Sequence, residues 1–290
     1  MKNIPVKWLF LVILSIIWGS SFILIKKGLI GLTAYQLGAL RNVFTGIILL
    51  IIGFKSLKTI KAKSWKWLAL SGFLGSFFPS FLFAIAETQI DSAVASILNS
   101  LVPLNTILIG FAVFRIVSTK KQIIGVIFGF IGTALLILQG ANLNPDQNYW
   151  FSGFIILATV MYASNINIIK RYLQEEKPLA IAAGNYIFII LPAFLILIVT
   201  DFFEASNFEK STFKDSVFFI LILSIFGTAI AKIIFNKLVQ ISTPVFTSSV
   251  TYLMPIVALL WGVLDGESLN ILQLFAAIMV LVGVYLAHRK

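Results

Sequence analysis

The chain has 290 residues, of which 59% are hydrophobic and 11% are charged, and its mean hydropathy is +1.01. Soluble domains carry roughly 25% charged residues, so this composition excludes a soluble globular protein and indicates an integral membrane protein. The chain has no cysteine, which excludes disulfides and thiol chemistry. No hydrophilic stretch exceeds about fifteen residues, which leaves no room for a catalytic domain outside the membrane.

Apolar runs long enough to cross a membrane recur along the whole chain. A helix crosses about 30 Å of hydrocarbon with about 20 apolar residues. Runs such as VFTGIILLIIGF (43–54) are apolar on successive residues, whereas the strands of a membrane β-barrel alternate apolar and polar residues. We therefore predict an all-α integral membrane protein with ten transmembrane helices at residues 7–26, 33–54, 65–86, 91–114, 121–138, 150–170, 179–199, 215–236, 243–264 and 270–287.

The formal net charge of +11 carries information about topology. With the N-terminus in the cytoplasm, most of the 22 Lys and Arg residues fall in segments that face the cytoplasm, which is the positive-inside pattern. We expect a multi-pass protein of the cell (cytoplasmic or inner) membrane with both termini cytoplasmic. The lipid bilayer accounts for the basic charge, so no nucleic-acid partner is predicted.

An internal repeat links the two halves of the chain. IIWGSSFILIKKG (16–28) and VMYASNINIIKRY (160–172) match at a constant separation of 144 positions, which pairs Trp18 with Tyr162, Ser21 with Asn165 and Lys26 with Lys170. At a slightly larger separation, Pro103 pairs with Pro255. Chance similarity between apolar segments is the competing explanation, but the matches stay in register over a whole window.

A repeat unit of five spans crosses the membrane an odd number of times, so its second copy must enter upside down. The predicted organisation is a first five-helix repeat at 1–138, an outer linker at 139–149 and a second, inverted five-helix repeat at 150–290. Inverted repeats are typical of secondary transporters, in which two halves rock about a site near the middle of the membrane.

Four motifs resemble the EamA-type members of the drug/metabolite transporter superfamily: WGSSFILIK (18–26), GALRNVF (38–44), SLVPLNTILIG (100–110) and the long C-terminal run that begins with MPIVALLWG (254–262). The resemblance covers essentially the whole chain. It implies ten helices, cytoplasmic termini, export of amino acids or other small metabolites, and a central cavity lined mainly by spans one, three, four, six, eight and nine. The chain departs from the family pattern at FRIVS (114–118) and at Lys232, which leaves the substrate class open.

Two basic residues lie within apolar spans. A charge at that depth is costly, so Arg41 should face the bundle interior or a wet cavity. It can anchor a substrate carboxylate or serve as a structural arginine that binds carbonyl groups. Lys232 can snorkel to the interface or face the cavity, and in the second case it favours anionic or zwitterionic solutes.

Aromatic and uncharged polar residues complete the candidate substrate site. Trp18 and Tyr162 lie mid-span at equivalent positions, and packing is the competing reading. Pro103 and Pro255 are predicted helix breaks, because each removes a hydrogen bond from the carbonyl four residues earlier. The remaining candidates, for which bonding between helices is the alternative, are Ser21, Asn99 and Asn165. Tyr252 is a further candidate because it is adjacent to Thr251, whose carbonyl Pro255 frees.

The predicted function is a secondary transporter, an exporter of amino acids or related small metabolites. No Asp or Glu lies near mid-depth, so a facilitator or exchanger is an alternative, and Glu87 is the one acid that we consider for coupling. The sequence contains no filter motif of the kind that a channel needs. It also lacks the converging catalytic groups that a membrane-embedded enzyme needs. No cofactor or metal is predicted. Gly125, Gly129 and Gly132 form a small-residue face, for which we expect close packing within the bundle, with a homodimer as the alternative.

Overall fold

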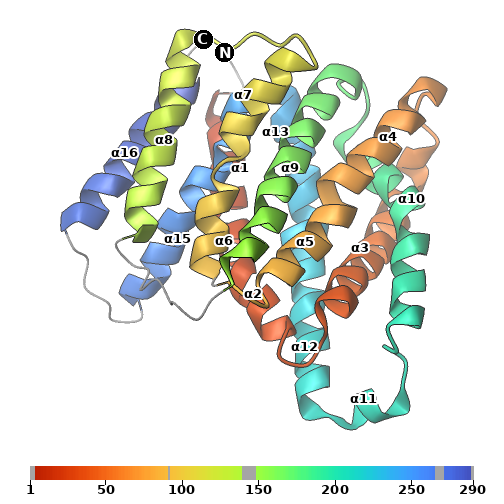
Figure 1. Cartoon of the computed structure of the whole chain (residues 1–290). Helices are drawn as coiled ribbons and strands as arrows, with labels where there is room; N and C mark the ends of the chain where they lie inside the picture. Colours follow the sequence, from red (N-terminus) through yellow and green to blue (C-terminus); the bar gives the residue numbers. More distant parts are fainter. Residues whose placement is uncertain (1–3, 91, 139–147, 265–270, 289–290) are drawn as a thin grey trace.

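The computed structural model describes residues 4–90, 92–138, 148–264 and 271–288, and every regular element among them is a helix (Figure 1). The first half contains α1 (Ile4–Gly19), α2 (Ser21–Gly28), α3 (Ala34–Leu57), η1 (Ala62–Ser64), α4 (Trp65–Gly72), η2 (Phe73–Phe77), α5 (Phe78–Ala86), α6 (Ser92–Asn99), α7 (Val102–Ala112) and α8 (Lys120–Leu138). The second half contains η3 (Tyr149–Phe151), α9 (Ser152–Tyr172), α10 (Pro178–Val199), α11 (Ala205–Glu209), α12 (Ser211–Ile222), η4 (Leu223–Ile230), α13 (Ala231–Ile241), α14 (Pro244–Ser248), α15 (Val250–Leu264) and α16 (Ile271–His288).

Six helical stretches are long and apolar enough to cross a membrane. They are Val6–Gly28, Ala34–Leu57, Ala62–Ala86, Ser152–Tyr172, Pro178–Val199 and Ser211–Ile241. The other four predicted spans coincide with α6–α7, α8, α14–α15 and α16, which include shorter apolar helices. The described part of the chain is therefore all-helical, and its apolar helices indicate a multi-pass membrane protein.

Two helix pairs form the flanks of the bundle. In Figure 1, α8 packs along α16 on one side and α3 packs along α10 on the other, and the two members of each pair run in opposite directions. Small residues allow the close approach: a Cβ atom added at Gly283 would lie 2.5 Å from the backbone nitrogen of Gly129. The small-residue face of α8 is thus used inside the chain, against α16.

Two π-helical segments interrupt the third long span of each half. η2 lies between α4 and α5, and η4 lies between α12 and α13. A π-helix carries one extra residue per turn and shifts the hydrogen-bond pattern from i→i+4 to i→i+5. Both segments border the centre of the bundle, so they set the direction of the side chains that follow them.

Helix breaks occur in both halves, but only one lies at a predicted proline. α6 ends at Asn99 and α7 begins at Val102, with Pro103 in its first turn, as expected. Pro255 differs, since it lies inside α15 and the chain breaks between α14 and α15, at Ser249. Serine side chains take part in that earlier break: Ser249 Oγ donates to the carbonyl of Phe246 at 2.6 Å.

Candidate functional site

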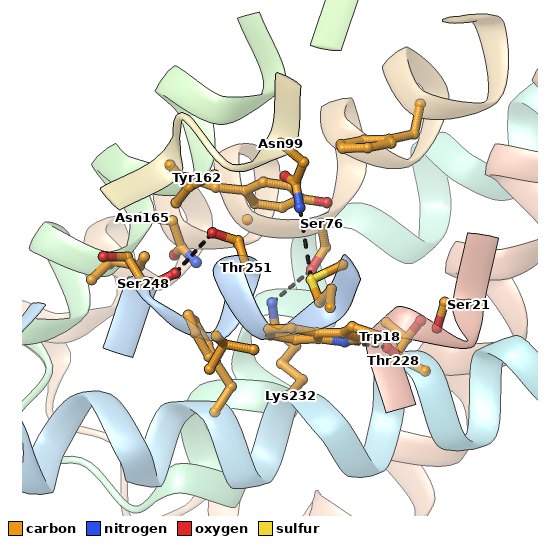
Figure 2. A pocket seen from close by; sticks show the side chains of 18 of the residues that line it. Trp18, Ser21, Ser76, Asn99, Tyr162, Asn165, Thr228, Lys232, Ser248 and Thr251 are labelled. Carbon is orange, nitrogen blue, oxygen red and sulfur yellow. Dashed lines mark hydrogen bonds between the residues drawn. The ribbon is translucent and has the colours of Figure 1, made fainter. Parts of the chain in front are cut away.

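A central pocket of about 130 Å³ lies where the two halves of the chain meet (Figure 2). The predicted substrate residues that line it are Trp18, Ser21, Arg41, Asn99, Tyr162, Asn165 and Lys232. The structure therefore brings together side chains from helices that are far apart in the sequence.

Arg41 reaches the pocket from α3. A reciprocal cap fixes the start of this helix: Gln36 N donates to Thr33 Oγ1 at 3.2 Å, and Thr33 N donates to Gln36 Oε1 at 3.1 Å. Arg41 follows about 12 Å further along the helix, where its Nε donates to Thr228 Oγ1 at 2.9 Å. The arginine lines the pocket, and its side chain also joins α3 to η4.

Lys232 faces the pocket and is only 7% exposed. Its Nζ donates to Ser76 Oγ at 2.6 Å and lies 5.9 Å from the centre of the Tyr186 ring. A lysine or arginine at the centre of a membrane helix costs about 2.5–3.5 kcal/mol on insertion scales. A hydroxyl group and an aromatic face therefore replace part of the water that this ammonium group loses.

Two aromatic pairs line the pocket. The rings of Trp18 and Phe235 are 5.2 Å apart, and those of Tyr162 and Phe83 are 6.0 Å apart. Trp18 Nε1 also donates to the carbonyl of Gly227 at 2.9 Å, inside η4. A shifted π-helical hydrogen-bond pattern leaves such carbonyls free for side-chain donors.

Two glycines in the π segments allow polar side chains to approach. A Cβ atom added at Gly75 would lie 2.3 Å from Asn165 Nδ2, and one added at Gly227 would lie 3.0 Å from Ser21 Oγ. Asn165 Oδ1 accepts a hydrogen bond of 2.6 Å from Ser71 Oγ. Both predicted polar residues, Ser21 and Asn165, therefore pack directly against a π segment.

Asn99 has a side-chain oxygen that can accept a further hydrogen bond. The residue is 5% exposed, and its Oδ1 has no hydrogen-bond partner among the described residues. Its Nδ2 lies 3.9 Å from Met254 Sδ, which is a weak acceptor. A buried amide oxygen without a partner is costly, so a donor group of a ligand in the pocket would stabilise it.

Tyr252 does not belong to the pocket. Its side chain is fully buried against α8, where its OH donates to the carbonyl of Val126 at 2.8 Å. The neighbouring Thr251 lines the pocket instead. Successive residues of a helix point about 100° apart, so adjacency to a pocket residue does not place Tyr252 in the pocket. Pro103 and Pro255 do not line it either.

Glu87 directly follows the apolar span Ala62–Ala86 and lies outside the pocket. Its Oε2 accepts a hydrogen bond of 2.9 Å from Ser92 Oγ, whereas its Oε1 is buried without a hydrogen-bond partner among the described residues. Burial raises the pKa of Glu87 to about 8, although the charges of Arg41 and Lys26 oppose the shift. A carboxyl group that titrates near neutral pH suits proton exchange.

The sequence analysis missed several lining residues, among them Ser76, Thr228, Thr251 and the partners Phe83 and Phe235. A signal for them existed. Gly75-Ser76 and Gly227-Thr228 are separated by 152 positions, the same separation as Pro103 and Pro255, and so are Phe83 and Phe235. Extending the repeat through the third spans would have found these residues.

The lining combines aromatic surface, hydroxyl and amide groups, and two basic side chains. Within the described part of the chain, no Asp or Glu lines the pocket, and no three His, Cys, Asp or Glu residues come together in a way that could hold a metal. The arrangement can bind a small molecule but offers no evident acid–base pair. Asp265 and the Gly266-Glu267 pair, along with Asp91, lie outside the described residues.

The sequence matches proteins that are named as transporters over nearly its whole length. The model of the EamA-like transporter family matches residues 6–138 and 150–289. The chain is 26% identical to the "Uncharacterized inner membrane transporter YedA" of Escherichia coli K12, covering 96% of this chain and 91% of that protein. It is 24% identical to the "Probable amino-acid metabolite efflux pump" of Salmonella typhimurium LT2, covering 93% and 91%.

A solved protein crystal structure has the same fold. It superposes with a TM-score of 0.73 at 16% sequence identity, covering 98% of this chain and 96% of the other. At this identity the likeness concerns the fold alone.

Proposed function

Because the chain belongs to the EamA-like transporter family, we propose that it is a secondary transporter that moves a small metabolite by alternating access, with the central pocket as its substrate site. Related proteins are named as transporters and not as enzymes. The observation that carries the proposal is the position of the pocket, since side chains from both halves of the chain converge on it.

Equivalent contacts in the two halves support an inverted repeat of ten spans. Trp18 of the first half packs against Phe235 of the second half. Its sequence counterpart Tyr162, in the second half, packs against Phe83 of the first half, and Phe83 is the counterpart of Phe235. Ser21 approaches Gly227 as its counterpart Asn165 approaches Gly75. Two-fold pseudo-symmetry produces such exchanged contacts, and two pseudo-symmetric halves are what alternating access needs.

The helix pairs on the flanks support the same organisation. Under the repeat, α8 is the counterpart of α16 and α3 is the counterpart of α10, and each runs antiparallel to its counterpart while packing against it (Figure 1). We therefore propose repeats at 1–138 and 150–290, with a linker at 139–149, of which 139–147 lie outside the described residues.

The proposed orientation places both termini in the cytoplasm. α1 begins and α16 ends at the same end of the bundle (Figure 1). In this orientation Lys55, Lys61, Lys63 and Lys170 fall in segments that face the cytoplasm, which suits the positive-inside rule. The names of the Escherichia coli and Salmonella relatives support the inner membrane as the location and efflux of amino acids or related metabolites as the transport reaction.

A facilitator or exchanger is the second candidate. It is favoured by one observation: no carboxylate lines the pocket among the described residues. In the proton-coupled alternative, Glu87 is the acid that exchanges protons, because burial raises the pKa of its carboxyl group to about 8.

Counterflow in proteoliposomes tests the proposal. Vesicles containing the purified protein are loaded with an unlabelled mixture of amino acids and organic acids, and the uptake of each labelled solute is measured. Alternating access predicts that uptake is saturable and that it is faster when unlabelled solute is present inside the vesicles. If uptake instead rises linearly with concentration and does not depend on the solute inside the vesicles, the protein is a channel and the proposal is contradicted.

A further inference from the structure

We propose that the pocket recognises its substrate through an anionic group, a carboxylate or another oxyanion, held between Arg41 and Lys232. This inference rests on the proposed transport function and narrows it. Among amino acids and related metabolites, it selects solutes with a net negative charge over organic cations.

The two basic side chains reach the pocket from different halves of the chain. Thr228 connects them, because it accepts the hydrogen bond from Arg41 Nε at 2.9 Å and lies four residues before Lys232. Arg41, Thr228 and Lys232 all line the pocket, and Figure 2 labels Thr228 and Lys232 within it.

Neither basic group is neutralised by an acid in the described part of the chain. The side-chain partners of Arg41 and Lys232 are the hydroxyl groups of Thr228 and Ser76. Glu87 is near enough to feel the charge of Arg41, but it does not line the pocket and forms no ion pair with Arg41. Buried charges are normally paired. A negatively charged group of a ligand can therefore supply the counter-charge that the described residues do not provide.

The geometry leaves donors available for such a ligand. A guanidinium group has five N–H donors and an ammonium group has three. Each uses one donor in a side-chain hydrogen bond to a described residue. The terminal amino groups of Arg41 and two hydrogens of Lys232 remain, and oxyanions match such donors with short, charge-assisted hydrogen bonds.

The rest of the lining fits an organic body next to the anionic group. Trp18, Phe22, Tyr162 and Phe235 provide aromatic surface. Asn99 Oδ1 is a neutral acceptor that suits a hydroxyl or amide donor. An organic cation finds two like charges and no carboxylate among the described lining residues.

The absence of cysteine allows a direct measurement of charge selectivity in the full-length protein. Single cysteines at two lining positions, Ser21→Cys and Thr251→Cys, are reacted in proteoliposomes with three methanethiosulfonates: anionic sulfonatoethyl, cationic trimethylammonioethyl and neutral methyl. Each rate is divided by the rate of the same reagent with 2-mercaptoethanol. The ionisation of the thiol affects all three reagents equally, so the ratio reports the local electrostatic potential.

We expect the corrected reaction rate of the anionic reagent to exceed that of the cationic reagent about tenfold, since two unit charges act at short range in a medium of low dielectric constant. The ratio should fall at least threefold in Lys232→Met and in Arg41→Gln. It should persist in Lys232→Arg, and in the control Lys237→Met, which removes an exposed lysine from the same helix.

The rate ratios of the two single-cysteine proteins test the proposal by themselves, so the test holds even if a charge-removing variant fails to fold. Equal rates, or a preference for the cationic reagent, would overturn anion recognition and leave the transport proposal intact. If the neutral methyl reagent reaches neither thiol, the pocket is not a transport site and both proposals fail.

Discussion

Lys232 Nζ donates a hydrogen bond of 2.6 Å to Ser76 Oγ, and this contact joins the two π-helical regions of the protein. Ser76 belongs to η2, and Lys232 follows η4 by two residues. The bond crosses the boundary between the two halves at the wall of the pocket. In an alternating-access cycle the halves move against each other, so contacts of this kind must lengthen or exchange partners.

The first prediction concerns this bond. Ser76→Ala leaves the buried ammonium group of Lys232 without its hydroxyl acceptor, which should lower the free energy of unfolding by about 1–3 kcal/mol and reduce transport per folded molecule about tenfold. Ser76→Thr keeps the hydroxyl group and should retain more activity. Ser164→Ala is the matched control, since Ser164 Oγ bonds only the carbonyl of Val160 in its own helix. If Ser76→Ala behaves like the control, the bond has no role in transport.

The second prediction tests topology. Ala62 and Asn148 are both exposed, and the proposed topology puts Ala62 on the cytoplasmic side and Asn148 in the outer linker. Ala62→Cys and Asn148→Cys should react with a membrane-impermeant maleimide from opposite sides, with only Asn148→Cys labelled in intact cells. Labelling of both thiols from one side would contradict the inverted repeat.

The third prediction concerns pH. The pKa of Glu87 is raised in the folded protein from 4.5 to about 8 by burial, so the folded state binds this proton more tightly than the unfolded state. The associated stability is fully present below about pH 4.5 and is lost as pH rises through about 8. Glu87→Gln should therefore flatten the decline of the melting temperature between pH 5 and pH 8. An unchanged decline would show that Glu87 does not titrate in this range.

Sequence reasoning located part of the pocket lining because polar groups inside apolar spans are costly and must find partners. Arg41, Lys232, Asn99 and Asn165 are conspicuous for that reason, and all four line the pocket. The π segments were not predicted, because one extra residue per turn is set by packing and leaves no periodic signal in so short a stretch. Their glycines could have been found only by aligning the third spans of the two halves.

The misplacement of Tyr252 has a different origin. It was inferred from its position beside the carbonyl that Pro255 frees, but the break lies at Ser249, and Thr251 is the neighbour that faces the pocket. Sequence adjacency fixes neither the rotation of a helix nor the side from which its partner helix approaches. Here α8 approaches Tyr252 so closely that a Cβ atom at Gly129 would lie 2.5 Å from its ring.

The fourth prediction separates the two tyrosines. Tyr252→Phe removes the hydrogen bond to the carbonyl of Val126 and should lower the free energy of unfolding by about 1 kcal/mol, with transport per folded molecule unchanged. Tyr162→Phe removes a hydroxyl group from the pocket and should reduce transport with little change in melting temperature. Thermal unfolding in detergent and uptake in proteoliposomes distinguish the two. The reverse pattern would place Tyr252, and not Tyr162, in the substrate site.

The last prediction concerns the glycines of the π segments. In Gly75→Ala, the new Cβ atom would lie 2.3 Å from Asn165 Nδ2 and must displace the side chain that accepts the hydrogen bond from Ser71. Loss of this buried bond should cost about 1–3 kcal/mol, and the altered pocket should transport at least tenfold more slowly. The double variant Gly75→Ala/Asn165→Ala removes the overlap, so it should regain melting temperature but not transport.

Gly153→Ala is the matched control for that variant. Gly153 is exposed on α9, and a Cβ atom added there meets no atom within 4 Å. Alanine in a helix is more stable than glycine by roughly 0.5–1 kcal/mol, so this variant should melt slightly higher and transport normally. If Gly75→Ala also transports normally, Asn165 can leave its observed position without consequence. The close packing of α9 against η2 would then have no part in substrate recognition.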